Sequence, residues 1–414
     1  MRRSTLATAL VALFVASYFG TPAAVKTGGF VETDLIANKT PLTDKNGHVH
    51  MVPAAQVDPH LLNPWGLTSR PSTPAQPVGS PFWVSDNGAG LATLYNVSGN
   101  TPNSVSINPL VVSIPAPGTK DVGNSGTPTG AVFNIDSGGF KIAGVDKNGV
   151  ATSASAVFLF VTEDGTIVGW NPGVGSSASS FNASGTSTQG IIAVDNSHVT
   201  FPQRPGAVYK GLAIATNPGG KTLLYVTNFR EGRVEVYDDN FAGVTFFTDP
   251  NLPPSYAPFN IALIGSELFV TFAVQDAAMH DDVAGQGHGI VDRFDLDGQI
   301  PRRFADHGQL NSPWGMAIAP ANFGDLGGSL WIGNFGDGNI NAFDLGSGKS
   351  LGQVRDTKGK TIVIDGLWSL QVGNGGNGGR TDTLYFTAGP NGEADGLFGS
   401  LTPEAASASA TVGQ

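Results

Sequence analysis

The sequence predicts an all-β fold, a six-bladed β-propeller closed by a strand from the N-terminal end of the chain. Three observations lead to this prediction. A pattern of three short strands recurs six times, its middle strands are apolar and aromatic, and most of these strands end in a glycine-containing turn. Repeats of roughly 40 to 50 residues with inserted loops are typical of propeller blades.

The middle strands show the repeat most plainly. They lie at 81–88, 159–165, 224–232, 268–276, 330–338 and 384–392. Each has one aromatic residue at an equivalent position, namely Trp83, Phe160, Tyr225, Phe269, Trp331 and Tyr385. Each middle strand is followed by a third strand. Each is also preceded by an inner strand, and the inner strands lie at 63–67, 128–133, 209–215, 258–264, 312–319 and 364–372. The inner strands open on small residues, which suit the crowded axis of a propeller.

The outer strands give weaker signals, with candidates at 110–115 and 244–250. The last repeat ends near Leu401 and has no outer strand of its own, so the apolar segment 29–37 is the natural donor. Its pairing would close the ring and cover an exposed sheet edge. We therefore predict one propeller domain over 29–401. The Ser-, Ala- and Gly-rich stretch 173–196 is predicted to be a flexible surface loop.

The two ends of the chain differ from the repeats in their composition. Arg2 and Arg3 precede an apolar run and a group of small residues, which predicts a signal peptide over 1–24. We therefore expect a secreted, extracytoplasmic protein without a membrane anchor after cleavage. Residues 402–414 contain few apolar side chains and are predicted to be a disordered tail.

Composition narrows the class of function. The 414 residues include 57 glycines and 27 prolines, and only 13% are charged, which suits short strands joined by tight turns. A net charge of -11 argues against nucleic acid or an anionic membrane as partner. The absence of cysteine excludes thiolate zinc sites, cysteine nucleophiles and iron–sulfur clusters. We expect a monomer.

Several longer motifs carry a resemblance to known proteins. They are NPWG, VTEDG, YKGLA, YAPFNI, HDDVAG, SPWGMA, GNFGDGNINAFD and FTAGPNGEADGLFG, spread between Thr33 and Leu401. Together they resemble an uncharacterised family of secreted microbial β-propellers related to NHL-type and lactonase-type propellers. The resemblance implies a six-bladed fold and little about function. Many members of that family have a C-terminal membrane-sorting segment; none is recognised here, which favours free secretion.

Strand topology indicates where a site would lie. In an antiparallel blade, the start of the first strand and the end of the second share one end of the sheet. The leading hypothesis is a channel at this face that binds a small molecule or carbohydrate. Its predicted lining is Asn63, Trp65, Asp86, Glu163, Arg230, Asn260, Trp314, Asn334, Asp337, Trp368 and Asp395. The three tryptophans either form an aromatic mouth or pack between blades.

The loop 275–289 is the sharpest chemical candidate. Asp276, Asp281 and Asp282 are candidate ligands of a divalent cation such as calcium, since oxygen ligands dominate the loop. His280 could act as a base beside one of these carboxylates. The alternative is a structured loop in which the aspartates cap turns.

Two further pairs have spacing that suits a site. Glu393 and Asp395 lie two residues apart, so their side chains would share one side of an extended loop, as an acid–base pair, as calcium ligands or as turn residues. His48 and His50 have spacing suited to a metal, or are incidental in a polar loop.

Three other functions stay open at this point. One is a metal-dependent, lactonase-like hydrolase with His280, Asp282 and Glu393 as catalytic residues. Another is a pocket that orients a reactive molecule for cyclisation. The last is a protein-interaction platform.

Overall fold

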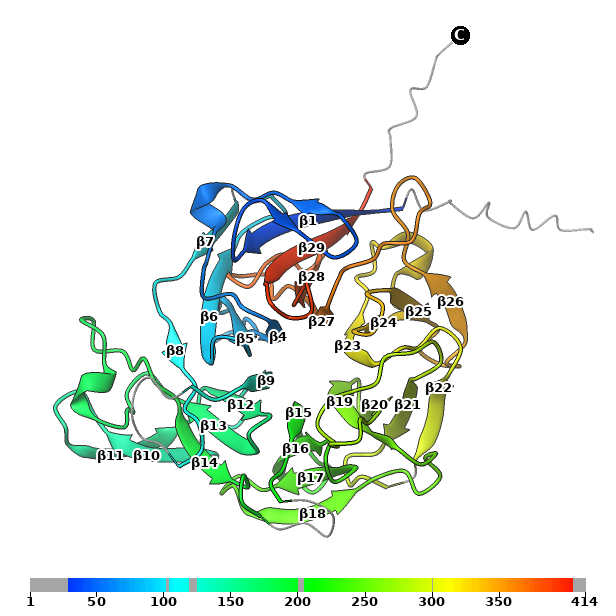
Figure 1. Cartoon of the computed structure of the whole chain (residues 1–414). Coiled ribbons are helices and arrows are strands. Elements are labelled where there is room, and N and C mark those ends of the chain that lie inside the picture. Colours follow the sequence, from blue (N-terminus) through cyan, green and yellow to red (C-terminus); the bar gives the residue numbers. More distant parts are fainter. Residues whose placement is uncertain (1–28, 102–103, 119–124, 200–204, 300, 405–414) are drawn as a thin grey trace, which may run out of the picture.

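Six antiparallel sheets stand radially around one axis, as Figure 1 shows. The structure is a computed structural model that describes residues 29–101, 104–118, 125–199, 205–299 and 301–404. Each sheet is one blade, and its first strand in sequence lies nearest the axis, except in the sheet that β1 (Phe30–Ala37) joins. The predicted fold class, an all-β six-bladed propeller, is confirmed.

The first three blades follow one another along the chain. Blade 1 contains β4 (Pro64–Thr68), β5 (Phe82–Asp86), β6 (Leu91–Val97), β7 (Val105–Ile107) and β8 (Val112–Ser113). Blade 2 contains β9 (Pro128–Phe133), β12 (Phe158–Thr162), β13 (Thr166–Trp170) and β14 (Ile191–Asp195). Blade 3 contains β15 (Tyr209–Thr216), β16 (Thr222–Asn228), β17 (Arg233–Tyr237) and β18 (Gly243–Phe247).

The last three blades repeat the order, and β1 completes the sixth. Blade 4 contains β19 (Tyr256–Ile264), β20 (Glu267–Val274), β21 (Ile290–Phe294) and β22 (Arg302–Asp306). Blade 5 contains β23 (Pro313–Ile318), β24 (Leu330–Asn334), β25 (Ile340–Phe343) and β26 (Ser350–Gln353). Blade 6 contains β27 (Leu367–Val372), β28 (Leu384–Ala388), β29 (Leu397–Pro403) and β1 (Phe30–Ala37).

Smaller elements decorate the ring. Two hairpins lie outside the blades, β2 (Leu42–Thr43) with β3 (Val49–His50), and β10 (Lys141–Val145) with β11 (Ala151–Ser155). Among the described residues, short 3-10 helices form at η1 (Ala54–Gln56), η3 (Ala178–Ser180) and η4 (Gly324–Leu326).

Strand β1 closes the ring by pairing with β29, as the missing outer strand of the last repeat predicts. The pairing is antiparallel and places Phe30 opposite Pro403 and Ala37 opposite Leu397. Strand β29 runs two residues further than expected, so Thr402 belongs to the sheet and not to the predicted tail. Figure 1 shows the blue β1 beside the red β29, so residues from the two ends of the chain share one blade.

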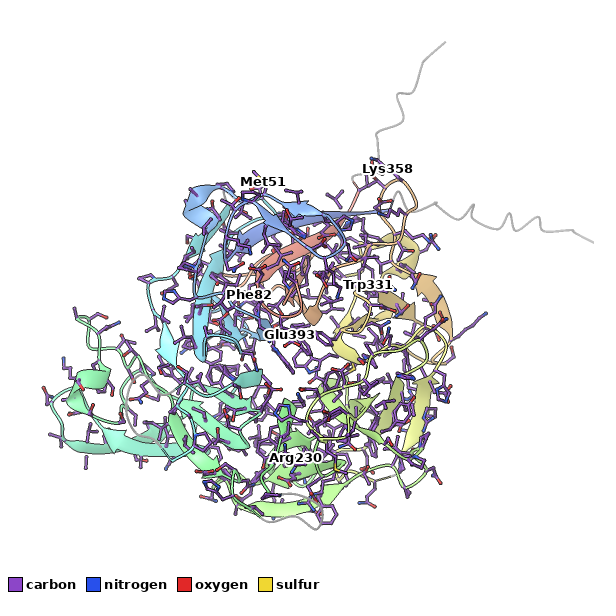
Figure 2. All side chains as sticks on the ribbon, in the orientation of Figure 1. Met51, Phe82, Arg230, Trp331, Lys358 and Glu393 are labelled. Carbon is purple, nitrogen blue, oxygen red and sulfur yellow. The ribbon has the colours of Figure 1, made fainter. Side chains whose placement is uncertain are left out.

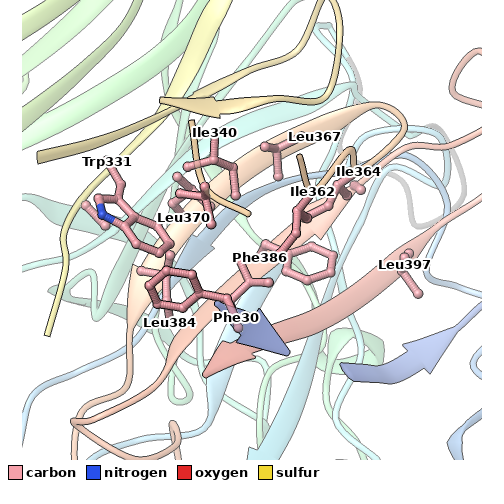
Figure 3. Close-up of a cluster of buried hydrophobic side chains, with 14 of the residues drawn as sticks. Phe30, Trp331, Ile340, Ile362, Ile364, Leu367, Leu370, Leu384, Phe386 and Leu397 are labelled. Atoms are coloured by element: carbon pink, nitrogen blue, oxygen red, sulfur yellow. The ribbon is translucent and has the colours of Figure 1, made fainter. Parts of the chain in front are cut away.

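Apolar side chains fill the spaces between neighbouring blades. The cluster between blades 5 and 6 is drawn in Figure 3, where Phe30 of β1 lies against Trp331 of β24. The ring centroids of this pair are 5.0 Å apart and nearly perpendicular, and Phe323 lies 5.3 Å from Phe30. The closing strand is therefore anchored by packing against the neighbouring blade as well as by its hydrogen bonds to β29.

The inner strands approach each other closely near the start of each strand, forming a narrow waist around the axis. A Cβ atom on Gly66 of β4 would lie 2.5 Å from the carbonyl oxygen of Thr129 in blade 2. A Cβ on Gly211 of β15 would lie 2.1 Å from Asn260 Oδ1 in blade 4. Only glycine allows its backbone to lie this close to a neighbouring blade, which explains the small residues at these openings.

A larger side chain in the waist is expected to destabilise the propeller. The Gly66→Ala substitution forces a Cβ against the backbone of blade 2, and we expect it to lower the free energy of unfolding by about 1–3 kcal/mol. The control is Gly243→Ala in β18, where the nearest atom would lie 3.8 Å away. Urea unfolding curves measure both; equal midpoints for the two variants would contradict the role of Gly66.

One expectation about the outer strands is wrong, and another is confirmed only in part. The stretch 173–196 is not simply a flexible loop, because it carries η3 and the outer strand β14, which pairs with β13. Serine and glycine hide this strand from a composition argument, whereas Ile191 and Val194 give it an apolar face. In blade 1 the candidate 110–115 forms only the short β8, and β7 pairs with the other end of β6.

The predicted signal peptide at 1–24 and residues 405–414 of the predicted tail lie outside the described part of the chain. Within the described ranges, no helix is long and apolar enough to cross a bilayer.

Candidate functional site

The inner strands begin, and the middle strands end, at one end of the ring, called the upper face below. A continuous set of polar contacts crosses the axis at this face. It involves Asn63, Asn87, Glu163, Lys210, His280, Asp281 and Glu393, here called the axial network. These residues come from blades 1, 2, 3, 4 and 6, so the network exists only in the closed ring. Figure 2 shows Glu393 near the axis.

Asn63 joins the first and last blades of the ring. Its Nδ2 donates hydrogen bonds to Glu393 Oε2 at 2.5 Å and to Asn87 Oδ1 at 3.3 Å. Its Oδ1 accepts a hydrogen bond from Trp368 Nε1 at 3.0 Å. The amide of Asn63 is therefore held in one orientation by partners from two blades.

The network continues across blades 2, 3 and 4. Asn87 Nδ2 donates to Glu163 Oε2 at 2.8 Å, and Glu163 Oε1 accepts a hydrogen bond from Lys210 Nζ. Lys210 Nζ also donates to Asp281 Oδ1 at 3.3 Å, and the same oxygen lies 2.9 Å from His280 Nδ1. One ammonium group thus bridges two carboxylates from different blades.

The backbone is strained at three positions around this site. Asn63 and Ser312, which precede the equivalent Pro-Trp-Gly motifs of blades 1 and 5, both have φ of 45°. Glu393, which accepts the hydrogen bond from Asn63, has φ of 70°. Left-handed backbone is unfavourable for a glutamate, and such strain tends to gather at functional sites.

Lys210 is a buried charge. Its side chain is only 1% exposed, and Nζ lies 5.1 Å from the centroid of the Trp65 ring. Burial by itself would lower the pKa of Lys210, but the charges of Glu163 and Asp281 outweigh burial and raise it. The pKa of Asp281 is held well below its usual range by the hydrogen bond with His280 and by the charge of Lys210. Lys210 is therefore protonated and Asp281 is ionised at neutral pH.

Glu393 behaves differently from Asp281. Burial raises its pKa, and the hydrogen bond from Asn63 only partly opposes this effect. The nearby charges of Glu163 and Asp281 raise the pKa of Glu393 further, while Lys210 lowers it. Glu393 is thus more easily protonated than Asp281 by a ligand or by a fall in pH.

An aromatic cluster closes the axis beneath the network. Trp65 and Trp368 stack with centroids 3.5 Å apart, and Trp314 lies edge-on to both of them. All three tryptophans are buried, so they pack against each other instead of lining an open mouth. Phe335, which is only partly buried, stacks on Trp368 at 3.9 Å and is the aromatic surface nearer to solvent.

A cavity of about 360 Å³ lies on the axis at the opposite end of the ring. All six inner strands line it, with apolar side chains such as Leu67, Leu212 and Ile261 and with no charged side chain. Asn260, predicted to bind ligand at the upper face, lines this lower cavity, and its Nδ2 donates to the Trp314 carbonyl oxygen at 2.8 Å. Because Trp314 also lines this cavity, the aromatic cluster separates it from the axial network.

Lys210 argues against a divalent cation in the axial network. Ligand atoms of Glu163, His280 and Asp281 lie within 4.8 Å of one another, a spacing that could suit a metal. However, the ammonium group of Lys210 already bonds to both carboxylates. A second cation there would face the like charge of a fully buried lysine. The residues present therefore do not fit a metal at this point.

The predicted calcium ligands of the 275–289 loop do not converge. Asp276 Oδ1 accepts hydrogen bonds from the backbone nitrogens of His280 at 2.8 Å and Asp281 at 3.3 Å, so this carboxylate shapes the loop. Asp282, proposed both as ligand and as catalytic residue, is half-buried near Ser312, and burial raises its pKa. Among the described residues, Asp276, Asp281 and Asp282 do not form a group with ligand atoms within 4.8 Å.

Other residues predicted to line the channel instead make contacts within a blade or beside it. Asp86 is fully buried inside blade 1, where its Oδ2 accepts a hydrogen bond from the backbone of Thr93 and burial raises its pKa well above the usual range. Asp395 forms an ion pair with Lys39 at 2.6 Å and ties the segment after β1 to blade 6.

Two blades carry predicted residues in turns. In blade 5, Asn334 Nδ2 donates to Asp337 Oδ1 at 3.1 Å and to the carbonyl oxygen of Gln309 at 2.7 Å. Arg230 of blade 3 donates to the carbonyl oxygens of Pro205 and Gly206, and Figure 2 shows it farther from the axis than Glu393. The structure therefore does not bring Asn334, Asp337 or Arg230 into the axial network.

Sequence reasoning missed the two residues that connect the network. Lys210 and Asn87 were not among the predicted site residues. A usable signal was present, because Lys210 is a charged residue at the opening of an inner strand, where the repeats otherwise place small, apolar or short polar residues. A lysine at the axis of a propeller needs carboxylate partners, and Glu163 and Asp281 supply them.

Comparison with known proteins finds relatives without an assigned function. No family model matches the chain. The uncharacterized protein R648 of Acanthamoeba polyphaga mimivirus is 32% identical over 84% of this chain and 76% of its own length. The uncharacterized protein L690 of the same virus is 33% identical over 85% of this chain and 83% of its own length. The expectation of an uncharacterised six-bladed propeller family is thereby confirmed.

Solved structures show distant likenesses to propellers. A PQQ-bound aldose sugar dehydrogenase from Streptomyces coelicolor matches with 12% identity and a TM-score of 0.43, over 91% of this chain and 98% of that one. A gluconolactonase from Xanthomonas campestris matches with 13% identity and a TM-score of 0.34, over 65% of this chain and 87% of that one. Likenesses this distant carry no argument about function.

Proposed function

Because this chain belongs to the family of the mimivirus proteins R648 and L690, for which no function is described, we propose a function from its own site. We propose that the axial network binds a small, hydroxyl-rich molecule such as a sugar at the upper face. The observation that supports this most strongly is the buried Lys210, which bridges Glu163 and Asp281 at the centre of the ring.

A largely buried ion pair such as that of Lys210 with Glu163 is a poor way to stabilise a fold. Ion pairs that are taken out of water recover little more than their desolvation cost, and apolar residues of similar size would serve as well. Five blades nevertheless contribute polar side chains to this one point, and two of those residues have strained backbones. We infer that the arrangement is retained for recognition and not for stability.

The chemistry of the network favours a ligand that donates hydrogen bonds. Glu163, Asp281 and Glu393 bring acceptor oxygens together, and ionised carboxylates can only accept. Lys210 is already engaged with two of them. Hydroxyl or ammonium groups therefore suit this surface, whereas a carboxylate on the ligand would be repelled. The partly exposed Phe335 offers an apolar face beside the network for a sugar ring.

The same geometry weakens the alternative of a metal-dependent hydrolase. Such an enzyme would need Glu163, Asp281 and His280 free to hold a cation, and Lys210 occupies that position. The pocket-templated cyclase would need an enclosed cavity at the upper face. The cavity of about 360 Å³ lies instead at the opposite end of the ring, beyond the aromatic cluster. No specific observation favours a protein-interaction platform.

Thermal-shift measurements test the proposal with three probes that differ in charge. We expect D-glucose and D-glucosamine to raise the Tm by about 2–5 °C at concentrations near 100 times Kd, and D-gluconate to have no effect. The Asn87→Ala variant, which removes the amide that links Asn63 to Glu163, is expected to lose the response. Asp337→Asn, a charge change on the same face outside the network, is expected to keep it.

Two results would refute this function. One is the absence of a shift with both glucose and glucosamine in a folded wild-type protein. The other is a shift of equal size in Asn87→Ala and wild type.

A further inference from the structure

The axial cavity at the lower end of the ring, here called the lower cavity, has no role in the function proposed above. Its volume is about 360 Å³, and residues of all six inner strands line it. An apolar cavity of about 150 Å³ is enough to hold benzene, so the lower cavity has room for a molecule about twice that size. Its volume also falls in the range that small-molecule sites usually have.

The lining of the lower cavity is divided into an apolar side and a polar side. Blades 2 to 5 supply mainly apolar side chains, among them Leu212, Ile261 and Met316. Blades 1 and 6, which are neighbours in the ring, supply the short polar side chains of Thr68, Ser69 and Ser369. A molecule that fills the cavity would therefore meet hydrocarbon on one side and hydroxyl groups on the other.

Two hydroxyl groups on the polar side have no partner in the described part of the protein. Thr68 and Ser369 are 8% and 7% exposed, and neither hydroxyl forms a hydrogen bond with a described residue. Asn260, the polar residue on the apolar side, differs from them. Its Nδ2 donates to the Trp314 carbonyl oxygen and its Oδ1 accepts from the backbone nitrogen of Ile261, both at 2.8 Å. Because a hydroxyl can both donate and accept, Thr68 and Ser369 offer a place for one polar group of a ligand.

The mouth of the lower cavity exposes large apolar side chains. Ile135, just after the inner strand of blade 2, is 50% exposed, and Leu263 on the inner strand of blade 4 is 41% exposed. Water beside such side chains finds few hydrogen-bond partners, so its displacement by an apolar group is favourable. Exposed apolar side chains gathered around a recess are typical of ligand-binding grooves.

The absence of charge in the lining limits the kind of ligand. No charged side chain lines the lower cavity, and the whole chain has a net charge of -11. An ionised carboxylate would lose its hydration in the cavity without gaining a cationic partner, and an ammonium group would lack a carboxylate partner there. The lower cavity therefore favours an uncharged molecule.

We propose that the lower cavity binds a small, uncharged molecule with an apolar body about twice the size of benzene and one hydroxyl group. The hydroxyl group bonds to Thr68 and Ser369, while the apolar body packs against blades 2 to 5. The aromatic cluster lies between this site and the axial network, so the two sites can be occupied independently.

Equilibrium dialysis of the full chain with three related compounds tests the site. Thymol has the proposed size and one hydroxyl group, p-cymene is the same hydrocarbon without the hydroxyl group, and cuminate carries a carboxylate instead. We expect saturable binding of one thymol molecule per chain. Binding of p-cymene should be weaker by about 2- to 10-fold, because it forms no hydrogen bond, and cuminate should not bind at the same concentrations.

Two variants separate the hydroxyl groups from the space that they line. Thr68→Val combined with Ser369→Ala removes both hydroxyl groups, and this variant is expected to bind thymol no more tightly than p-cymene. Ser369→Leu fills part of the cavity and is expected to weaken the binding of both compounds by about 10-fold or more. The matched control is Ser106→Leu, at an exposed position of the outer strand β7, which should bind like wild type.

If Ser369→Leu does not fold, the variant with Thr68→Val and Ser369→Ala decides. The proposal is overturned if wild type shows no saturable binding of thymol, or if cuminate binds as tightly as thymol. It is also overturned if the folded cavity variants bind thymol with wild-type affinity. None of these results bears on sugar binding by the axial network, which is measured with glucose and glucosamine.

Discussion

The Lys210→Met substitution is expected to lower the free energy of unfolding by about 3–5 kcal/mol, the cost of breaking a buried ion pair from one side. The methionine fills a similar volume but leaves Glu163, which is 11% exposed, without its cation, whereas Asp281 is 65% exposed and stays solvated. The expected cost therefore comes mainly from Glu163, together with the loss of two charge-assisted hydrogen bonds that join blades 2, 3 and 4. Urea unfolding monitored by tryptophan fluorescence measures the change.

A second substitution separates charge from packing. In Lys210→Met with Glu163→Gln, one uncompensated carboxylate is removed, and we expect a substantial part of the lost stability to return. Lys147→Met, at an exposed lysine, serves as the control and should change stability little. If Lys210→Met is as stable as Lys147→Met, the network does not carry a buried ion pair and the proposed binding function loses its main support.

The Phe30→Ala substitution is expected to cost about 3–5 kcal/mol, because it leaves a cavity beneath the closing strand. Phe30 is 3% exposed and packs against Trp331 and Phe323, so its loss loosens the contact between β1 and blade 5 (Figure 3). The effect should be concentrated at the closure. We expect amide hydrogens of β29 to exchange faster in this variant than those of blade 3.

The neighbouring residue provides a matched control for this prediction. Val31 lies on the same strand but points outward and is 41% exposed, so Val31→Ala should change stability by about 0.5 kcal/mol or less. Both substitutions shorten an apolar side chain in β1, and only one empties the core. Equal effects of the two would show that β1 contributes hydrogen bonds to β29 and no packing against blade 5.

The six blades and their closure could be predicted because the evidence for them lies within single strands and recurs in every repeat. Each middle strand has its own apolar pattern, and the aromatic residue recurs at one position, as Trp83 and Trp331 illustrate. The absence of an outer strand after Leu401 indicated that β1 must supply it. The outer strand β14 was missed, since its flanking serines and glycines resemble those of a loop.

The site was predicted only in part. Antiparallel topology correctly placed Asn63, Glu163 and Glu393 at one face, and the structure joins all three to one network. Asp86 and Asp395 were assigned to the same face, but their side chains do not join the network. Asp86 accepts a hydrogen bond inside blade 1, and Asp395 pairs with Lys39 in the segment after β1. Topology assigns a residue to an end of a sheet, but it does not say whether its side chain points to the axis.

The sequence by itself determined the architecture of this protein, because alternation along a strand and glycine in its turns act over a few residues. Only the tertiary structure decided which polar side chains meet. Asn63 and Glu393 are 330 positions apart, yet they share a hydrogen bond because β1 closes the ring. Lys210 of blade 3 likewise meets Glu163 of blade 2 and Asp281 of blade 4 only because these blades stand side by side around the axis. Burial and partner are set by all six blades together, and they decide whether a charge is neutralised or needs a ligand.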